Sequence, residues 1–305
     1  MANWPNSYNV AMYKQAIINT LYRIMQLALT LFALLPLSII HAIGAAFGML
    51  AYIFASKHRR ILNKNIALYH PVQDKKSLLN LNIAETGKAF FETFPIWLRS
   101  HASVLGLVKN CTGWQHVETA LTAGKGIIFL TPHLGCFEIT SLYYGAQYPM
   151  TVLYRAPRQR WLLPLIKSGR QRGNITLAPA NSAGVKLLLQ ALKRGEAIGM
   201  LPDQAPFEGE GDWAPFFGKP AYTMTLAGKL AKKTGAHVLM AFGERLSCGQ
   251  GYHIHITPIE AGGIATPALM NAEIERTITQ KPAQYLWSYD RYKARHQALP
   301  PDYFG

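Results

Sequence analysis

The residues from Ile24 to Ser56 include no Lys, Arg, Asp or Glu. This stretch of 33 residues constrains the fold most strongly, because about 20 consecutive apolar residues suffice to span a bilayer. Pro36 interrupts the stretch and predicts a kink, since proline removes a hydrogen bond from a helix. Three arrangements satisfy the pattern: a spanning or deeply inserted helix, a kinked or paired helix in the membrane interface, and a buried helix of a soluble core.

Basic residues flank this stretch unequally. Residues 57–64 carry a basic cluster directly after it, whereas Lys14 and Arg23 are the basic residues that precede it. Positively charged residues prefer the cytoplasmic side of a membrane. We therefore expect residues 1–56 to form an N-terminal membrane-anchoring helical segment and residues 57–305 to form a cytoplasmic domain.

Short apolar runs alternate with helical patterns in the remainder of the chain. The predicted strands are Ile127–Leu130, Thr151–Tyr154, Ile175–Leu177, Ala197–Leu201, Val238–Phe242 and the segment YHIHITPI that begins at Tyr252. The predicted helices are residues 74–100, Cys136–Gly145, Trp161–Arg172, Ser182–Arg194 and Thr223–Thr234. Strands that alternate with helices of this length indicate an α/β fold, with a central sheet flanked by helices.

The segment GIIFLTPHLGCFEIT places a histidine at the end of a predicted strand. Pro132 stops the strand, so His133 lies at its carboxyl end, where α/β sheets usually bind ligands. We expect Glu138, in the first turns of the next helix, to reach back to the imidazole. A neutral imidazole can take a proton from an attacking alcohol, and a carboxylate on its other nitrogen fixes the tautomer. Alternatively, His133 only caps the strand and Glu138 faces solvent.

Two other predicted strands also end in polar residues. Arg155 ends the strand of TVLYRAPRQR, with Arg158 close by, and Asp203 and Gln204 follow the strand that ends at Leu201. Taken singly, the arginine is a surface residue and the aspartate a turn former. Taken together, three strand ends supply a base, a cation and an acid, which is how a site is assembled on an α/β scaffold. The loop after Gln204 contains a pair of phenylalanines, 216–217, that lines an acyl pocket or packs in the core.

The combination of these motifs resembles the bacterial lipid A biosynthesis acyltransferase family. The resemblance rests on H-x4-E, LYR, LPDQ, PFFG and the closing segment PAQYLWSYDRYKAR, all behind an apolar N-terminal segment. It implies a glycerolipid-acyltransferase-like fold with a mixed sheet. It also implies that His133 and Glu138 form a catalytic dyad, and that substrate is bound by Arg155, Arg158, Asp203 and Gln204.

The resemblance further implies the substrates and the location. The donor would be an acyl-acyl carrier protein, and the acceptor a hydroxyl of an anionic lipid A precursor at the cytoplasmic face of the bacterial inner membrane. Many members have Asn before the histidine and Trp before the glutamate, whereas this chain has Pro132 and Phe137. These departures leave another glycolipid or an aminolipid open as the acceptor.

The charge balance agrees with anionic partners. The chain has 31 Lys and Arg against 16 Asp and Glu, a net charge of +15, which favours an anionic membrane, an acidic protein or nucleic acid. No nucleic-acid-binding motif is evident, so we expect no nucleic-acid partner; a non-catalytic basic membrane scaffold remains an alternative. His253 and His255 alternate on one face of a predicted strand, but no nearby acid or cysteine pattern completes a metal site, so neither a metal nor another cofactor is expected.

Overall fold

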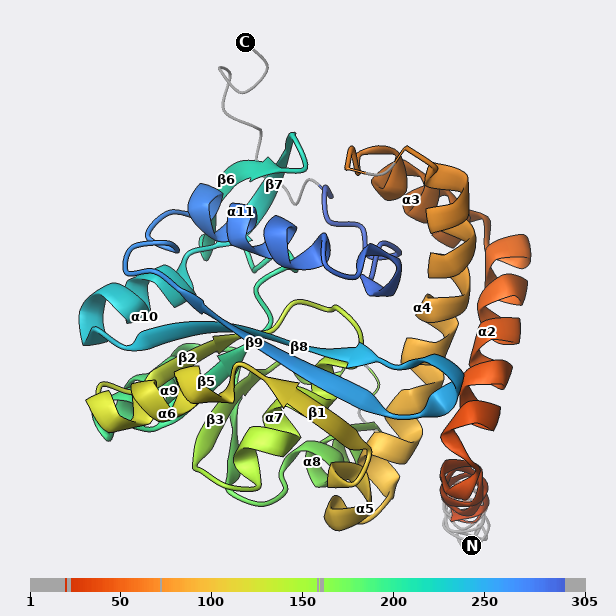
Figure 1. Ribbon diagram of the computed structural model, residues 1–305, viewed down its shortest axis with the longest axis horizontal. Helices are drawn as coiled ribbons and strands as arrows, with labels where there is room; N and C mark the ends of the chain where they lie inside the picture. Colours follow the sequence, from red (N-terminus) through yellow and green to blue (C-terminus); the bar gives the residue numbers. More distant parts are fainter. Residues whose placement is uncertain (1–19, 21–22, 72, 158, 160–161, 294–305) are drawn as a thin grey trace, which may run out of the picture.

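The computed structural model describes residues 20, 23–71, 73–157, 159 and 162–293. Within these residues, seven strands form a sheet in the order β1-β9-β8-β2-β5-β3-β4 (Figure 1). Neighbouring strands are parallel except β8 and β9, which are antiparallel. The predicted α/β fold with a mixed sheet flanked by helices is therefore confirmed.

The predicted strands all occur, and three further strands were not predicted. The strands are β1 (Val108–Thr112), β2 (Ile127–Leu130), β3 (Met150–Tyr154), β4 (Ile175–Pro179), β5 (Ala197–Met200), β6 (Gly211–Phe216), β7 (Lys219–Met224), β8 (His237–Arg245) and β9 (Tyr252–Ile259). The unpredicted strands are β1 and the hairpin β6–β7, which lies in the segment predicted as a loop. Phe217 and Gly218 form the hairpin's two-residue turn at φ 47° and 74°, as tight hairpin turns require positive φ values.

The helices lie on both faces and along one flank of the sheet. They are an unlabelled helix (Arg23–Leu34), α2 (Leu37–Phe54), α3 (Ser56–Ala67), α4 (Lys75–Leu98), α5 (His101–Leu105), α6 (Trp114–Ala123), α7 (Phe137–Gly145), α8 (Leu163–Arg170), α9 (Ser182–Lys193), α10 (Leu226–Thr234) and α11 (Pro267–Ile278), with short 3₁₀ turns at Ser247–Gly249 and Pro282–Gln284. The helix predicted to begin near Thr223 begins at Leu226 instead, because Thr223 belongs to β7.

Two hydrophobic cores lie on opposite faces of the sheet. Buried side chains of α9, α10 and α11 pack on one face, and those of α6 and α7 pack on the other. Every residue of β2 and β5 is buried, which explains why these strands are continuous apolar runs rather than alternating ones. The ends of the central strands are therefore fixed by packing on both sides.

The predicted kink at Pro36 is confirmed. The first helix ends at Leu34, and α2 begins after Pro36. Arg99 donates hydrogen bonds of 2.6 Å from Nε to the Ala33 carbonyl and from Nη2 to the Leu35 carbonyl. These bonds satisfy two acceptors at the helix break, where carbonyl groups lack helical partners.

The helix α2 runs side by side with α4 along one flank of the molecule (Figure 1). Glycines form the contact: a Cβ atom added to Gly87 would lie 1.9 Å from the Gly44 carbonyl oxygen, and one added to Gly48 would lie 2.2 Å from the Ile83 carbonyl oxygen. Small residues let two helix backbones approach this closely. The two helices therefore cross at backbone contact, which larger residues would prevent.

The face of α2 that points away from α4 is apolar and exposed. Among the described residues, α2 is the one helix that by length and composition could cross a membrane, and 28% of it is buried. The exposed large side chains of α2 include Ile39, Ile43, Leu50 and Ile53. A helix whose exposed face is apolar differs from the usual surface helix, which is polar on its outer side.

A buried ionic network joins α2 to α4 and to the β8–β9 pair. The Glu92 carboxylate lies 3.1 Å from His41 Nε2 and accepts bonds from Arg245 Nε at 2.8 Å and from the Tyr252 hydroxyl at 3.0 Å. Burial alone would raise the pKa of Glu92, but Arg245 and His41 together lower this pKa to about 2. The carboxylate is therefore ionised and compensated inside the protein.

Candidate active site

The predicted site residues follow three neighbouring strands. His133 follows β2, Asp203 follows β5 and Arg155 follows β3. These strands are adjacent in the order β2-β5-β3 and run parallel, so their carboxyl ends meet at one edge of the sheet. The structure therefore brings together the three strand ends that the sequence singled out.

The carboxylate that binds the His133 imidazole belongs to Asp203. His133 Nδ1 lies 2.7 Å from Asp203 Oδ1, and the His133 backbone N–H donates to Asp203 Oδ2 at 2.9 Å. On the other side of the ring, Gln204 Nε2 lies 3.2 Å from His133 Nε2. A proton on Nδ1 and a lone pair on Nε2 satisfy both contacts. This is the tautomer that a general base requires.

Asp203 is held as a carboxylate. It is 2% exposed, and burial by itself would raise its pKa. The charge of His133 and the hydrogen bonds from its ring and backbone outweigh burial, so the pKa of Asp203 lies below its ordinary value. A charged acceptor on Nδ1 stabilises the imidazolium that forms when Nε2 takes up a proton.

Glu138 does not reach back to the imidazole as we expected from the sequence, but binds Arg170. Arg170 Nε donates to both carboxylate oxygens of Glu138, at 3.0 and 2.9 Å, and Nη2 adds a short contact to Oε1. Burial alone would lower the pKa of Arg170, but Glu138 raises it above its ordinary value. The geometric reason is that Glu138, the second residue of α7, lies in a cleft next to α8, whereas Asp203 approaches His133 from the adjacent strand.

The C-terminal segment fixes the loop that carries His133. The Leu286 N–H donates to the His133 carbonyl at 3.0 Å, and the Gly135 N–H donates to the Gln284 carbonyl at 3.0 Å. Gly135 has φ 60°, and a Cβ atom there would lie 2.0 Å from the Gly243 carbonyl oxygen. A glycine is therefore required at this turn.

Two asparagines hold the C-terminal segment in place. Asn65 of α3 donates from Nδ2 to the carbonyls of Trp287 and Tyr289, both at 2.7 Å. Asn82 of α4 donates in the same way to the carbonyls of Ala283 and Tyr285, again at 2.7 Å. The segment that resembles the family's closing motif is thus part of the support of the site.

Two clefts open at this edge of the sheet. One, of about 140 Å³, is lined by Arg155, Gln204, Leu153 and Leu201 among others. The second is narrower, shares Leu153 and Leu201, and contains Glu138 and Arg170 with mainly apolar neighbours from β3, β4 and β5. Each cleft thus combines charged side chains with apolar neighbours, which suits a substrate that combines a charged group with an alkyl chain.

The remaining predicted residues have different positions. Arg155 is exposed, with its guanidinium carbon 4.1 Å from the centre of the Phe207 ring. Arg158 lies outside the described residues. Phe216 and Phe217 are 1% and 7% exposed and belong to the core beside α11, so they pack in the core rather than line the clefts.

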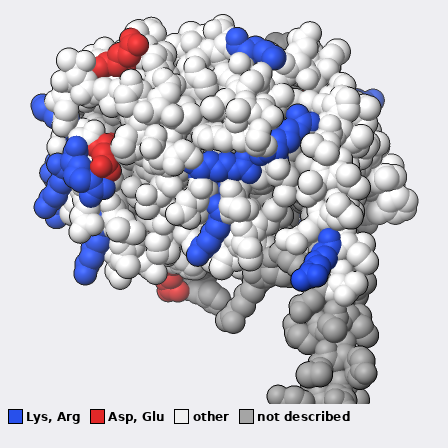
Figure 2. Space-filling model, turned by 90° about the horizontal axis from the view of Figure 1, so that it is seen from below, with Lys and Arg blue, Asp and Glu red and all other residues white. Residues whose placement is uncertain are grey.

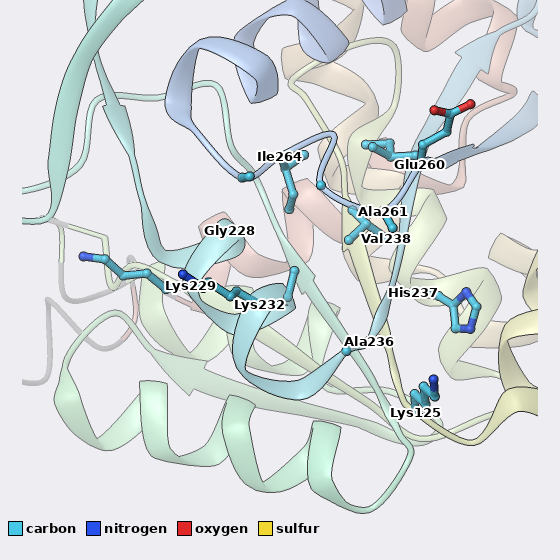
Figure 3. Close-up of a pocket in the computed structure, with 15 residues that line it drawn as sticks. Lys125, Gly228, Lys229, Lys232, Ala236, His237, Val238, Glu260, Ala261 and Ile264 are labelled. Atoms are coloured by element: carbon cyan, nitrogen blue, oxygen red, sulfur yellow. The ribbon is translucent and has the colours of Figure 1, made fainter.

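A larger cavity, of about 670 Å³, lies away from these residues (Figure 3). Its lining includes Lys125, Lys229, Lys232 and His237. Lys125 precedes β2 and His237 begins β8, so the cavity is at the amino ends of these strands, whereas His133 follows the opposite end of β2. Its size therefore does not make it the catalytic pocket, because His133 follows the carboxyl end of β2.

Arg170 is the residue that the sequence analysis missed. It lies near the end of the helix predicted over Trp161–Arg172, where a basic residue commonly complements the helix dipole. Its side chain is 20% exposed and contacts a carboxylate that is 6% exposed. No local pattern signals this pair, because its two members are 32 residues apart.

The whole chain is similar to known proteins of one family. The sequence model of the family described as bacterial lipid A biosynthesis acyltransferase matches residues 12–294. The chain is 26% identical over 279 residues to the lipid A biosynthesis lauroyltransferase of Escherichia coli (strain K12), covering 88% of this chain and 90% of the relative. It is 28% identical over 277 residues to the palmitoleoyltransferase of the same strain, covering 88% and 89%. It is 22% identical over 272 residues to the lipid A biosynthesis myristoyltransferase of that strain, covering 86% of this chain and 84% of the relative.

Proposed function

Because this chain belongs to the bacterial lipid A biosynthesis acyltransferase family, and is therefore an acyltransferase, we propose that it moves a fatty acyl chain from an acyl-acyl carrier protein to a hydroxyl of a lipid A precursor. The observation that carries this proposal is the imidazole of His133, held on Nδ1 by Asp203 at 2.7 Å with Nε2 turned toward Gln204. Gln204 also lines the cleft of about 140 Å³, so the side chain that contacts Nε2 borders this cleft.

In the proposed reaction, His133 acts as a general base. The acceptor hydroxyl replaces the Gln204 amide at Nε2, and its oxygen attacks the thioester carbonyl as Nε2 takes the proton. The new C–O bond forms, the C–S bond breaks, and the imidazolium returns the proton to the departing thiolate. Asp203 stabilises the imidazolium between these steps, because a charged hydrogen-bond acceptor lies on its Nδ1.

Glu138 remains a proposed site residue, with a role that runs through Arg170. The ion pair lies in the narrower cleft, beside the cleft that contains Arg155. Glu138 holds the guanidinium in a fixed orientation by two Nε contacts. We assign Glu138 and Arg170 to positioning of the acyl group, and Arg155 to binding an anionic part of donor or acceptor.

The membrane supplies the acceptor in this proposal. Large apolar side chains are exposed along α2 and along the preceding helix, at Ile24, Leu27, Leu31 and Leu34. Lys and Arg side chains also spread over a face of the molecule that shows few acidic groups (Figure 2). Each basic group near an anionic bilayer contributes about 1 kcal/mol. We propose that the apolar face inserts into the inner membrane and that the sheet domain faces the cytoplasm.

The test is acyl transfer by purified full-length protein in detergent. It compares wild type with His133→Ala, and with His70→Ala as a control in an exposed histidine outside the site. We expect His133→Ala to lose at least about 10²–10⁴-fold in kcat and His70→Ala to keep wild-type turnover. A folded His133→Ala enzyme with near wild-type turnover would refute the mechanism. Mass spectrometry of lipid A and total lipid from cells with and without the gene identifies the acceptor, and also tests the glycolipid and aminolipid alternatives.

A further inference from the structure

Two histidines and a glutamate gather on β8 and β9, which lie on the other side of β2 from β5 and β3. Glu244 lies directly opposite His253 in the antiparallel β8–β9 register, and Phe242 lies opposite His255. Alternate residues of a strand share a face, so all four side chains point to the same side of the sheet. The acid that was missing from the sequence pattern is thus supplied by the neighbouring strand.

The three polar side chains converge. His255 Nε2 lies 2.8 Å from Glu244 Oε2, and the two imidazole rings stack with centres 4.0 Å apart. One ligand atom from each of Glu244, His253 and His255 lies within 4.8 Å of the others. Ligands of a tetrahedral ion with bonds of about 2.1 Å are about 3.4 Å apart, so small side-chain rotations suffice to surround an ion.

We propose that Glu244, His253 and His255 form a binding site for a divalent transition-metal ion, with Zn²⁺ as its ligand. Imidazole nitrogen suits Zn²⁺, and one carboxylate oxygen completes a set of three protein ligands that occurs in zinc proteins. The stacked rings bring both histidines close together before an ion binds. The site is independent of acyl transfer, whose proposed base follows β2.

Two neighbours shape this site. The Thr112 hydroxyl of β1 lies 2.7 Å from His253 Nε2 and orients the ring, as outer-shell partners of metal-binding histidines do. Lys281 Nζ lies 2.5 Å from Glu244 Oε1, and its side chain is 42% exposed. Lys281 thus competes with a cation for the same carboxylate, and it has room to move into solvent when an ion binds.

The experiment is isothermal titration of ZnCl₂ into untagged full-length protein in detergent. All variants carry Cys248→Ser, because this exposed thiol in the β8–β9 turn would bind zinc by itself. We expect one Zn²⁺ per chain. His253→Ala and His255→Ala should each lose more Zn²⁺ affinity than the roughly 10–100-fold that loss of an outer-shell partner costs. His70→Ala, an exposed histidine outside the cluster, serves as the matched control and keeps the affinity.

Lys281→Ala gives the sharper result. If the carboxylate is a ligand, removal of the competing ammonium increases Zn²⁺ affinity, whereas Glu244→Gln decreases it. If Glu244 only pairs with Lys281 and is no ligand, neither change alters the Zn²⁺ affinity. Absence of saturable Zn²⁺ binding, or binding that persists unchanged in His253→Ala and His255→Ala, overturns the proposal. Acyl transfer is measured in parallel, so loss of zinc binding with intact turnover keeps the two sites distinct.

Discussion

The assignment of Asp203 as the partner of His133 leads to a direct comparison of two carboxylates. In Asp203→Asn the amide takes the place of a buried acceptor that is 2.7 Å from Nδ1. The neutral amide does not stabilise an imidazolium, and its NH₂ group favours the wrong ring tautomer. In a serine-protease triad the same change costs about 10⁴-fold in kcat. We expect Asp203→Asn to lose about 10²–10⁴-fold, which is about 3–5 kcal/mol of transition-state stabilisation at 1.36 kcal/mol per tenfold.

Glu138→Gln is expected to lose activity for another reason. The amide leaves the Arg170 guanidinium, whose side chain is 20% exposed, without a counter-charge. Breaking such a pair costs stability, on the order of 1–3 kcal/mol here because Arg170 is partly solvated. Because Glu138 acts through Arg170, the double variant Glu138→Gln/Arg170→Gln should be no less active than the worse single variant.

The assay separates these two roles by pH and by energetic coupling. Steady-state rates of acyl transfer are measured from pH 5 to 9, with unfolding followed in the same detergent. In Asp203→Asn the acid limb of the kcat/KM profile moves to lower pH, because the imidazolium has lost its anionic neighbour. In Glu138→Gln the limb stays in place while turnover falls. If instead Glu138→Gln moves the limb and Asp203→Asn keeps kcat within tenfold of wild type, Glu138 is the partner of His133 during catalysis and our reasoning from the geometry is wrong.

Three further predictions concern the surroundings of the site. Arg155→Ala should lower kcat/KM several-fold at unchanged stability, with a smaller effect at high salt; steady-state kinetics at two ionic strengths check this, and Lys186→Ala, in an exposed lysine of α9, is the control. Glu92 has a folded pKa of about 2, well below its ordinary value of 4.5, so its contribution of about 3 kcal/mol is fully present above pH 4.5 and is lost as the pH falls toward 2. Urea unfolding at pH 7 and pH 3 should show more than half of this loss in wild type, and a flatter dependence in Glu92→Gln. Gly87→Leu should separate α2 from α4, because even a Cβ atom would lie 1.9 Å from the Gly44 carbonyl oxygen. Limited proteolysis checks this: residues 57–64 should be cleaved faster in Gly87→Leu than in the control Leu81→Ala, which changes an exposed residue of α4.

The sequence was sufficient for the elements that build the edge of the sheet. The strand Ile127–Leu130 was predicted with its observed bounds, because an apolar run closed by Pro132 has few other solutions. Asp203 and Arg155 follow strands of the same kind, so their presence at one edge was predictable too. The hairpin β6–β7 was not, because its many Gly and Pro residues are typical of a loop and its pairing depends on contacts with α11.

The partners of the site residues were not predictable, because they depend on strand order. The sequence argument chose Glu138 for His133, since the two are five residues apart. Asp203 is 70 residues away from His133 and becomes its neighbour only because β5 lies beside β2. Glu244 and His253 likewise meet through the antiparallel register of β8 and β9. Local spacing thus identified the participating strand ends but not the pairs that form between them.

The role of α2 follows from the network that it enters. His41 of α2 contacts Glu92, and Glu92 binds Arg245 at the end of β8. The backbone of Arg245 exchanges two hydrogen bonds of 2.8 Å with the Gln284 side chain, and the Gln284 carbonyl accepts from Gly135, two residues after His133. A helix whose outer face suits a membrane therefore supports, through buried polar contacts, the loop that carries the proposed base. Deleting residues 1–56 would remove part of this support together with the apolar face.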